Sequence, residues 1–317
     1  MEKLFQKISF ASASLVLALL LGIFTTLYLA AQPAISEFGF NFLVDERWNQ
    51  EVSLVDTSVA TTQPTVTSEE ILDEDDMILD EDDEDGASTK TVYGGLVPII
   101  GTLLSTLIAL IFALPIAMGI AVFLAEIAPK NIANITGMAI ELLAAIPSII
   151  FGMWGLYYFA PIIAETFGGY QVSLLTAGLV LGVMILPFMA AITRDSMNTT
   201  PDVLKESAYA LGATKFEVVK DIIFPYSKVG IIGSIILALG RALGETMAVA
   251  FLIGAVYSMP EKITDPTISI PVAMAVNFGE ASGLGESALF YLGLILFVLS
   301  FTIISIAKFY FLKKVKN

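Results

Sequence analysis

The sequence predicts an all-α membrane protein with six transmembrane helices. Of its 317 residues, 56% are hydrophobic and only 15% are charged, whereas a soluble domain is usually about one quarter charged. Six apolar stretches reach the ~20 residues that a helix needs to cross a bilayer. A backbone in lipid must satisfy its own hydrogen bonds, so each stretch is expected to be a helix. The expected spans are Ile8–Ala31, Pro98–Ala125, Ile132–Ala164, Val172–Thr193, Val229–Tyr257 and Ser287–Ala307.

The composition also excludes several classes of protein. The chain has neither Cys nor His, which removes disulfides, thiolate or imidazole metal ligands and every His-based catalytic triad. It has no G-x-x-x-x-G-K-[ST] stretch, so it carries no nucleotide-hydrolysing P-loop. The net charge is −15 and no basic face is visible, which argues against nucleic-acid binding. We therefore expect a chain that is not itself an enzyme and binds no metal.

The distribution of basic residues predicts the orientation. Segment 1–31 is expected to be a retained N-terminal transmembrane helix, because its apolar stretch exceeds the roughly 7–15 residues of a signal-peptide core. With the N-terminus in the cytoplasm, the inner segments hold 12 of the 16 Lys and Arg residues. Cytoplasmic loops carry such an excess of basic residues, so both termini are expected inside. The tail 313–317 is basic, which suits the inner membrane surface.

Segment 32–96 is expected to be an extracytoplasmic loop with an acidic insert at about 50–90. Residues Glu69–Asp85 hold 12 carboxylates, a composition typical of a solvated, disordered spacer. An EF-hand loop with its glycine at Gly86 would begin at Glu81 rather than Asp and end at Val92 rather than Glu, so that template fails. Loose divalent-ion binding and docking of a basic partner remain as alternatives.

Three charged residues lie inside predicted spans. Arg241 is 12 residues into the fifth span, ~18 Å deep at 1.5 Å per residue, and Glu245 follows at i+4 on the same helix face. A charge at that depth costs ~2.5–3.5 kcal/mol, so both are expected to face the bundle interior and to pair. Glu141 is expected either to pair with Arg241 or to reach toward the cytoplasm.

Two interpretations of these charges stay open. The first is a structural ion pair that holds helices together, although desolvation makes such pairs weak evidence for stability. The second is a substrate pathway, because a guanidinium matches the oxygens of phosphate-like anions bidentately. Pro115, Pro147 and Pro187 fall inside the second, third and fourth spans, and each is expected to kink or break its helix.

The inner loop 194–228 is expected to form two short helices joined at a glycine. Pro201 suits a helix entry, apolar residues follow at helical spacing, and Gly212 is expected to end the first helix. A second amphipathic helix is expected to end at Pro225. The result is either a plain surface hairpin or a rigid knuckle that docks in the cytoplasm.

This loop resembles the E-A-A-x3-G-x9-I-x-L-P pattern of permease subunits of ATP-binding-cassette importers. Glu206, Ala208, Gly212, Ile222 and Pro225 match at the right spacing. Ser207 replaces the second residue of the motif, an Ala, and Phe224 replaces the Leu; both changes are mild. Four other stretches narrow the resemblance to phosphate-importer permeases of the PstC type. They are Gly94–Thr102, Glu141–Gly155, Gly240–Val249 and Leu292–Lys308.

The resemblance implies a type I importer permease (MetI-like) fold in a bacterial cytoplasmic membrane, with a five-helix core at 97–312. It implies a homodimeric cytoplasmic ATPase that uses ATP and Mg²⁺ and grips the loop at Glu206, Ser207, Ala208, Gly212 and Pro225. A PstA-like second permease and an extracytoplasmic phosphate-binding protein would complete the complex, and this chain would bind no cofactor. Arg241, Glu245 and Glu141 would line the substrate pathway. A permease for sulfate or molybdate, and a channel or carrier without an ATPase, are the alternatives.

Overall fold

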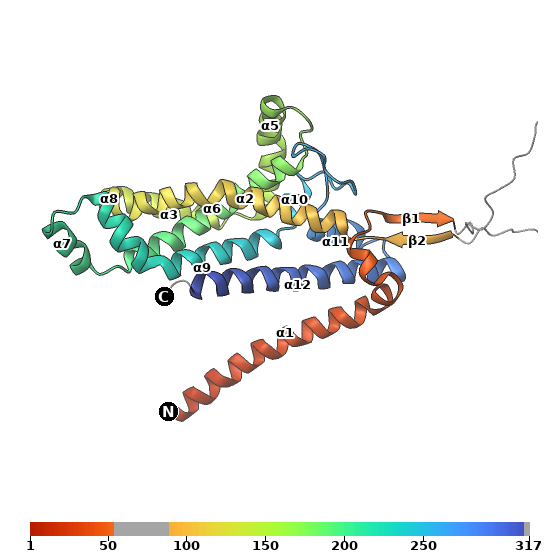
Figure 1. The fold of residues 1–317 in the computed structure, drawn as a ribbon, viewed down its shortest axis with the longest axis horizontal. Coiled ribbons are helices and arrows are strands. Elements are labelled where there is room, and N and C mark those ends of the chain that lie inside the picture. Colours follow the sequence, from red (N-terminus) through yellow and green to blue (C-terminus); the bar gives the residue numbers. More distant parts are fainter. Residues whose placement is uncertain (54–88, 314–317) are drawn as a thin grey trace, which may run out of the picture.

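The computed structural model describes residues 1–53 and 89–313. Within them, six helices are long and apolar enough to cross a membrane, which confirms the predicted fold class. The start of α1 (Glu2–Phe38) and the end of α12 (Leu284–Lys313) lie at the same end of the molecule as α7 (Asp202–Ala210) and α8 (Lys215–Glu217), as Figure 1 shows. The opposite end carries a two-stranded hairpin. An even number of crossings requires the two termini to share one side.

The N-terminal helix α1 (Glu2–Phe38) runs past its expected end and continues into a 3₁₀ turn at Gly39–Leu43. Its second half packs on α12 (Leu284–Lys313), where the Phe24 and Phe297 rings lie 5.7 Å apart. Its first half diverges from the bundle toward the N-terminus (Figure 1) and exposes its apolar side chains. That surface is left for lipid or for another subunit.

The centre of the bundle is α6 (Leu174–Asn198), which packs between α2 (Leu96–Val122) and α9 (Phe224–Leu243). Small residues let α2 and α6 approach closely, because a Cβ on Gly178 would lie 2.7 Å from the Ile108 side chain. The hydroxyls of Thr193 and Ser234 are 2.8 Å apart and fix the antiparallel register of α6 and α9. This core positions everything described below.

The third predicted span, Ile132–Ala164, is not one continuous helix, so that prediction is wrong. The chain forms α3 (Lys130–Ala144), breaks at 145–147, and resumes as α4 (Ser148–Trp154). A π-helical turn at Gly155–Phe159 and α5 (Ala160–Phe167) complete the crossing helix. Pro147 causes the break, because it lacks an N–H and disfavours helical backbone at the residue before it. Pro115 and Pro187, by contrast, lie inside uninterrupted α2 and α6.

The fifth predicted span is wrong at both ends. The helix runs from α8 through the π-helical turn η4 (Val218–Ile223) into α9 and ends at Leu243. After Gly244–Thr246 the chain makes one short turn, α10 (Met247–Ala250), and then continues without regular structure. Glycine has a low helix propensity, and Gly244 stands at this end as the residue that caps α9.

The outer end of the molecule carries the hairpin. Strand β1 (Trp48–Ser53) pairs antiparallel with β2 (Thr89–Tyr93), and the register opposes Ser53 to Thr89. Helix α11 (Ile270–Asn277) and the start of α12 lie beside the hairpin. The predicted insert at about 50–90 therefore includes residues of both strands at its ends. Its acidic part, Glu69–Asp85, lies outside the described residues.

Candidate functional site

Arg241 lies at the level of the middle of the bundle. It stands in the last turn of α9, seven residues beyond Ser234. Ser234 bonds Thr193 of the antiparallel helix α6, and Phe188 precedes Thr193 by five residues on that helix. The guanidinium carbon of Arg241 accordingly sits over the Phe188 ring, 5.9 Å from its centroid. An aromatic face attracts a cation at this distance. Sequence reasoning missed Phe188, since nothing in the apolar run of α6 distinguishes it.

The expected pair between Arg241 and Glu245 is wrong. The helix ends at Leu243, so the two residues do not share a helix face; Glu245 Oε1 instead accepts a hydrogen bond of 3.2 Å from the Ala248 backbone N–H. Among the described residues, no carboxylate oxygen lies within 4.0 Å of the Arg241 guanidinium. Each charge instead stands at a favourable helix end: Arg241 at the negative end of α9 and Glu245 before the positive end of α10.

Glu141 lies away from Arg241, so the expected pair between these two residues is also wrong. It stands on α3 before the break, with a side chain that is 59% exposed, and its carboxylate meets Arg194 at 3.1 Å. Arg194 is close to the inner end of α6 and also binds Asp195 at 2.9 Å. The alternative expectation, that Glu141 reaches toward the cytoplasm, stays a prediction.

The two interrupted spans meet each other. Helix α4 packs against α10, and a Cβ on Gly152 would lie 3.0 Å from the Ala248 Cα and 2.9 Å from the Phe251 ring. Irregular backbone at membrane depth occurs where it is buried in protein or lines a cavity. The contact between α4 and α10 therefore places the end of α9, just after Arg241, close to the helix that crosses the membrane after Pro147.

The inner loop folds into an elbow, defined here as α7, α8 and η4, residues 202–223. Gly212 closes α7 in the left-handed conformation, with φ +86°. Its N–H donates to Tyr209 O (2.9 Å) and the Ala213 N–H donates to Ala208 O (3.1 Å), the two hydrogen bonds of a Schellman motif. The prediction that Gly212 ends the first short helix is confirmed.

The prediction that Pro225 ends a second short helix is wrong. Pro225 occupies the first turn of α9, where its missing N–H is not needed. The π-helical turn η4 precedes it and widens the helix there, so the proline ring meets less obstruction from the preceding turn. The elbow is thus continuous with the helix that carries Arg241.

The elbow presents an apolar surface at the inner end of the molecule. Leu211 is 90% exposed and Phe216 is 73% exposed, which is unusual for large apolar side chains outside the bilayer. Glu206 and Ser207 are exposed, whereas Ala208 is half-buried against η4. A shallow hollow of about 350 Å³ adjoins them. It is lined by Ala208, Leu211, Gly212, Ala213, Glu217, Val218, Asp221 and Ile222.

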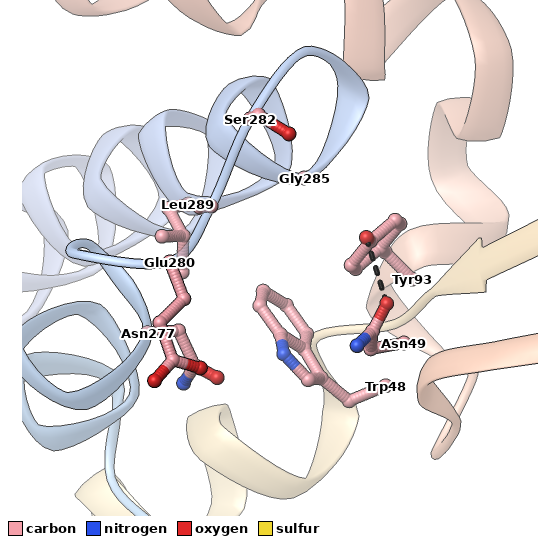
Figure 2. Close-up of a pocket in the computed structure, with 9 residues that line it drawn as sticks. Trp48, Asn49, Tyr93, Asn277, Glu280, Ser282, Gly285 and Leu289 are labelled. Atoms are coloured by element: carbon pink, nitrogen blue, oxygen red, sulfur yellow. Dashed lines mark hydrogen bonds between the residues drawn. The ribbon is translucent and has the colours of Figure 1, made fainter.

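At the outer end, aromatic side chains fix the hairpin to the bundle. Trp48 stacks on Tyr257 with ring centroids 5.0 Å apart and planes 3° apart. Asn277 Nδ2 donates to Tyr257 Oη (2.9 Å), and burial raises the pKa of Tyr257, so this phenol stays neutral at physiological pH. Figure 2 shows the adjoining polar pocket of about 220 Å³, where Tyr93 Oη donates to Asn49 Oδ1 (3.0 Å) opposite Glu280.

Comparisons with known proteins agree with this arrangement. Residues 98–317 match the family described as "Binding-protein-dependent transport system inner membrane component". The phosphate transport system permease protein PstC of Pasteurella multocida is 40% identical over 97% of this chain and 90% of its own length. The PstC protein of Mesorhizobium japonicum is 38% identical over 97% and 89%, and the probable PstC protein of Methanocaldococcus jannaschii is 33% identical over 71% and 77%.

A solved structure shares the fold. It is an inward-facing conformation of the MetNI methionine ABC transporter, with a TM-score of 0.50 and 19% identity over 68% of this chain and 90% of that chain. The family match spans more than half of the sequence, and the PstC relatives match nearly all of it. The chain therefore belongs to the family of binding-protein-dependent transport system inner membrane components, and within it to the PstC permeases.

Proposed function

We propose that this chain is the permease subunit of an ATP-driven importer of inorganic phosphate and forms half of its translocation pathway. The carrying observation is the 40% identity to a phosphate permease over 97% of the chain. The unpaired cation at mid-bundle supports the same proposal. A PstA-like second permease supplies the other half, and the exposed apolar faces of α1, α2 and α3 offer it surface to cover.

Arg241 and Glu245 are the pathway residues in this proposal. The Arg241 guanidinium is permanently charged and has N–H donors that bind no described side chain, so it can receive phosphate oxygens bidentately. The Phe188 ring faces the guanidinium carbon of Arg241 and leaves the edge of the guanidinium, with its N–H donors, available to the anion. Glu245 repels the anion and keeps its binding weak enough for release. Glu141, with Arg194, belongs to the inner mouth of the pathway.

The elbow couples this pathway to a homodimeric cytoplasmic ATPase, which binds ATP and Mg²⁺; this chain binds no cofactor and hydrolyses nothing. Exposed Leu211 and Phe216 insert into the ATPase surface, and Glu206 and Ser207 lie beside them. Ala208 and Gly212 set the shape of the elbow, and Pro225 begins the helix that leads to Arg241. Movement of the docked elbow is therefore movement of α9.

The opposite face receives an extracytoplasmic phosphate-binding protein. The hairpin and the polar pocket beside Glu280 lie at that end, away from the elbow (Figure 1). This assignment places both termini in the cytoplasm, in agreement with the excess of inner Lys and Arg residues. The complex belongs in the bacterial cytoplasmic membrane.

The decisive test is ATP-dependent phosphate uptake by vesicles that hold the whole complex with Arg241→Gln. We expect uptake to fall by at least about a hundredfold, because loss of a bidentate charged contact costs on the order of 3 kcal/mol. Arg47→Gln is the matched control: Arg47 pairs with Asp45 on the outer surface, and its loss should leave uptake unchanged. Co-purification of all subunits checks assembly.

Three outcomes would contradict the proposal. Normal uptake by an assembled Arg241→Gln complex would remove Arg241 from the pathway. Sulfate or molybdate that competes better than phosphate would assign a different oxyanion. Phosphate flux through vesicles that hold this chain alone would indicate a channel or carrier without an ATPase.

A further inference from the structure

A buried ion pair joins the elbow to the inner end of α2. Lys205 Nζ of α7 lies 2.7 Å from Glu126 Oε1, in the π-helical turn η2 (Phe123–Ile127) that follows α2. The two side chains are only 16% and 9% exposed. Among the ion pairs of the described residues, this is the one with both partners largely buried; the other pairs each expose at least one side chain by 48% or more.

The pair sits beside a separate apolar core. Met197, Val218, Ile223 and Ile231 are buried there, with Ala125 and Ala208 packed against them. Ala125 precedes Glu126, and Ala208 follows Lys205 by three residues on the same face of α7. The same core contains Ala121 of α2 and Val218 of η4, so apolar contacts already join α2 to the elbow. The ion pair adds a direct polar contact between α7 and the turn that follows α2.

Helix α2 continues this connection into the bundle. It packs along α6, which carries Phe188, and it also contacts α9, which carries Arg241. The elbow is therefore attached to the surroundings of Arg241 in three ways: covalently through α9, by apolar contacts between η4 and α2, and by the ion pair between α7 and η2. Replacing a buried ion pair by apolar residues is often neutral for stability, so stability alone does not account for this pair.

We propose that Glu126 and Lys205 are positioning residues that transmit movement of the elbow to α2, so that α2 and α9 move together when the ATPase acts. This inference rests on the proposed function. Without the pair, α7 keeps its apolar contacts with η4 and the elbow still docks, but α2 follows the movement of α7 less closely, because only the apolar core then joins them. ATP is then hydrolysed without matching opening of the pathway.

The test uses the complete complex in vesicles and measures phosphate uptake per ATP hydrolysed. We expect Glu126→Gln and Lys205→Met each to lower this ratio about tenfold, a change within the range of interaction energies measured for residues in contact. The rate of ATP hydrolysis should change less than about twofold. Lys205→Arg and the exchange Glu126→Lys with Lys205→Glu keep opposite charges and should retain most of the ratio. Arg47→Met removes the ion pair with Asp45 at the opposite end of the molecule and should leave the ratio unchanged.

Each result is decisive. Single variants that assemble and keep the wild-type ratio overturn the inference and leave the proposed function intact. If the single variants fail to assemble, the exchanged pair decides, because a low ratio or lost assembly in that variant overturns the inference. Wild-type vesicles without ATP-dependent phosphate uptake overturn the proposed function, and the inference fails with it.

Discussion

At the residue scale, the conformation of Gly212 decides how the elbow closes. Its φ of +86° is one that an L-residue adopts only at a cost of ~1–2 kcal/mol, except for Asn or Asp. The space beside it is open, so a side chain would meet strain rather than a clash. This position could be predicted from the sequence, because a glycine directly after apolar helical spacing is a common helix terminator.

We therefore expect Gly212→Val to lower phosphate uptake by roughly fivefold to thirtyfold, through ~1–2 kcal/mol of backbone strain in the docked elbow. Gly212→Asn tolerates the left-handed conformation and is the matched control, with uptake near wild type. Gly212→Asp is expected to lower uptake as well, since it adds a charge beside Glu217 and Asp221 in the hollow. Uptake per assembled complex measures all three, and equal uptake with Val and Asn would contradict the argument.

The partner of Arg241 could not be predicted in the same way. The i+4 spacing to Glu245 implies a pair only if the helix continues, and it ends at Leu243. The spacing of Gly240 and Gly244 is typical of a close helix-packing motif, but a glycine at 244 is equally compatible with a helix end. Which of the two occurs depends on how α10, which follows directly, packs against α4, which is distant in sequence. Arg241 itself was identifiable, because an isolated charge in an apolar stretch stands out.

At the element scale, three similar prolines behave differently. Pro115 and Pro187 lie within α2 and α6, which stay continuous, whereas Pro147 separates α3 from α4. The buried neighbours of α2 and α6 keep those helices in place. Helix α3 has fewer such neighbours and carries Asn131 and Asn134, polar residues that weaken the case for a span. Pro147 predicted the break itself, and the polarity of α3 was the further signal that the crossing helix begins only after it.

The close contact of the two interrupted spans gives a prediction about α4. We expect Gly152→Val to push α4 from α10 and to lower phosphate uptake at least about tenfold, because overpacking costs typically 1–3 kcal/mol. Gly119→Ala is the control, since a Cβ there meets nothing within 4 Å. Uptake is measured together with co-purification of the partner subunits. A Gly152→Val complex that assembles and transports normally would show that this contact does not hold the pathway.

At the scale of the whole molecule, hydropathy and basic residues predicted most of the architecture. Bilayer thickness requires six long apolar helices, and the chain ends and elbow share one end (Figure 1). The hairpin was not predicted, because β1 and β2 are separated by the acidic sequence and only their pairing reveals them. The tie between Lys205 and Glu126 was missed for the same reason: 79 residues separate its members.

The hairpin register gives a prediction for the segment between its strands. Ser53 and Thr89 are directly opposed, so a two-residue Asn-Gly turn can connect them in place of residues 54–88. We expect the shortened chain to take up phosphate within about twofold of wild type, because the strands, Trp48 and its stack on Tyr257 all remain. A deletion of 51–89 is less suitable, since it would also remove paired strand residues.

Trp48→Ala in the full-length chain is the contrasting variant. It removes a buried ring from the hairpin's contact with Tyr257, which costs on the order of 3–5 kcal/mol and should detach the hairpin from the outer end of the bundle. Uptake should then fall, although the chain still inserts. The opposite result is a shortened chain that inserts normally but loses uptake, together with a Trp48→Ala chain that keeps it. That result would show that residues 54–88 are needed for transport and that the stack of Trp48 on Tyr257 is not.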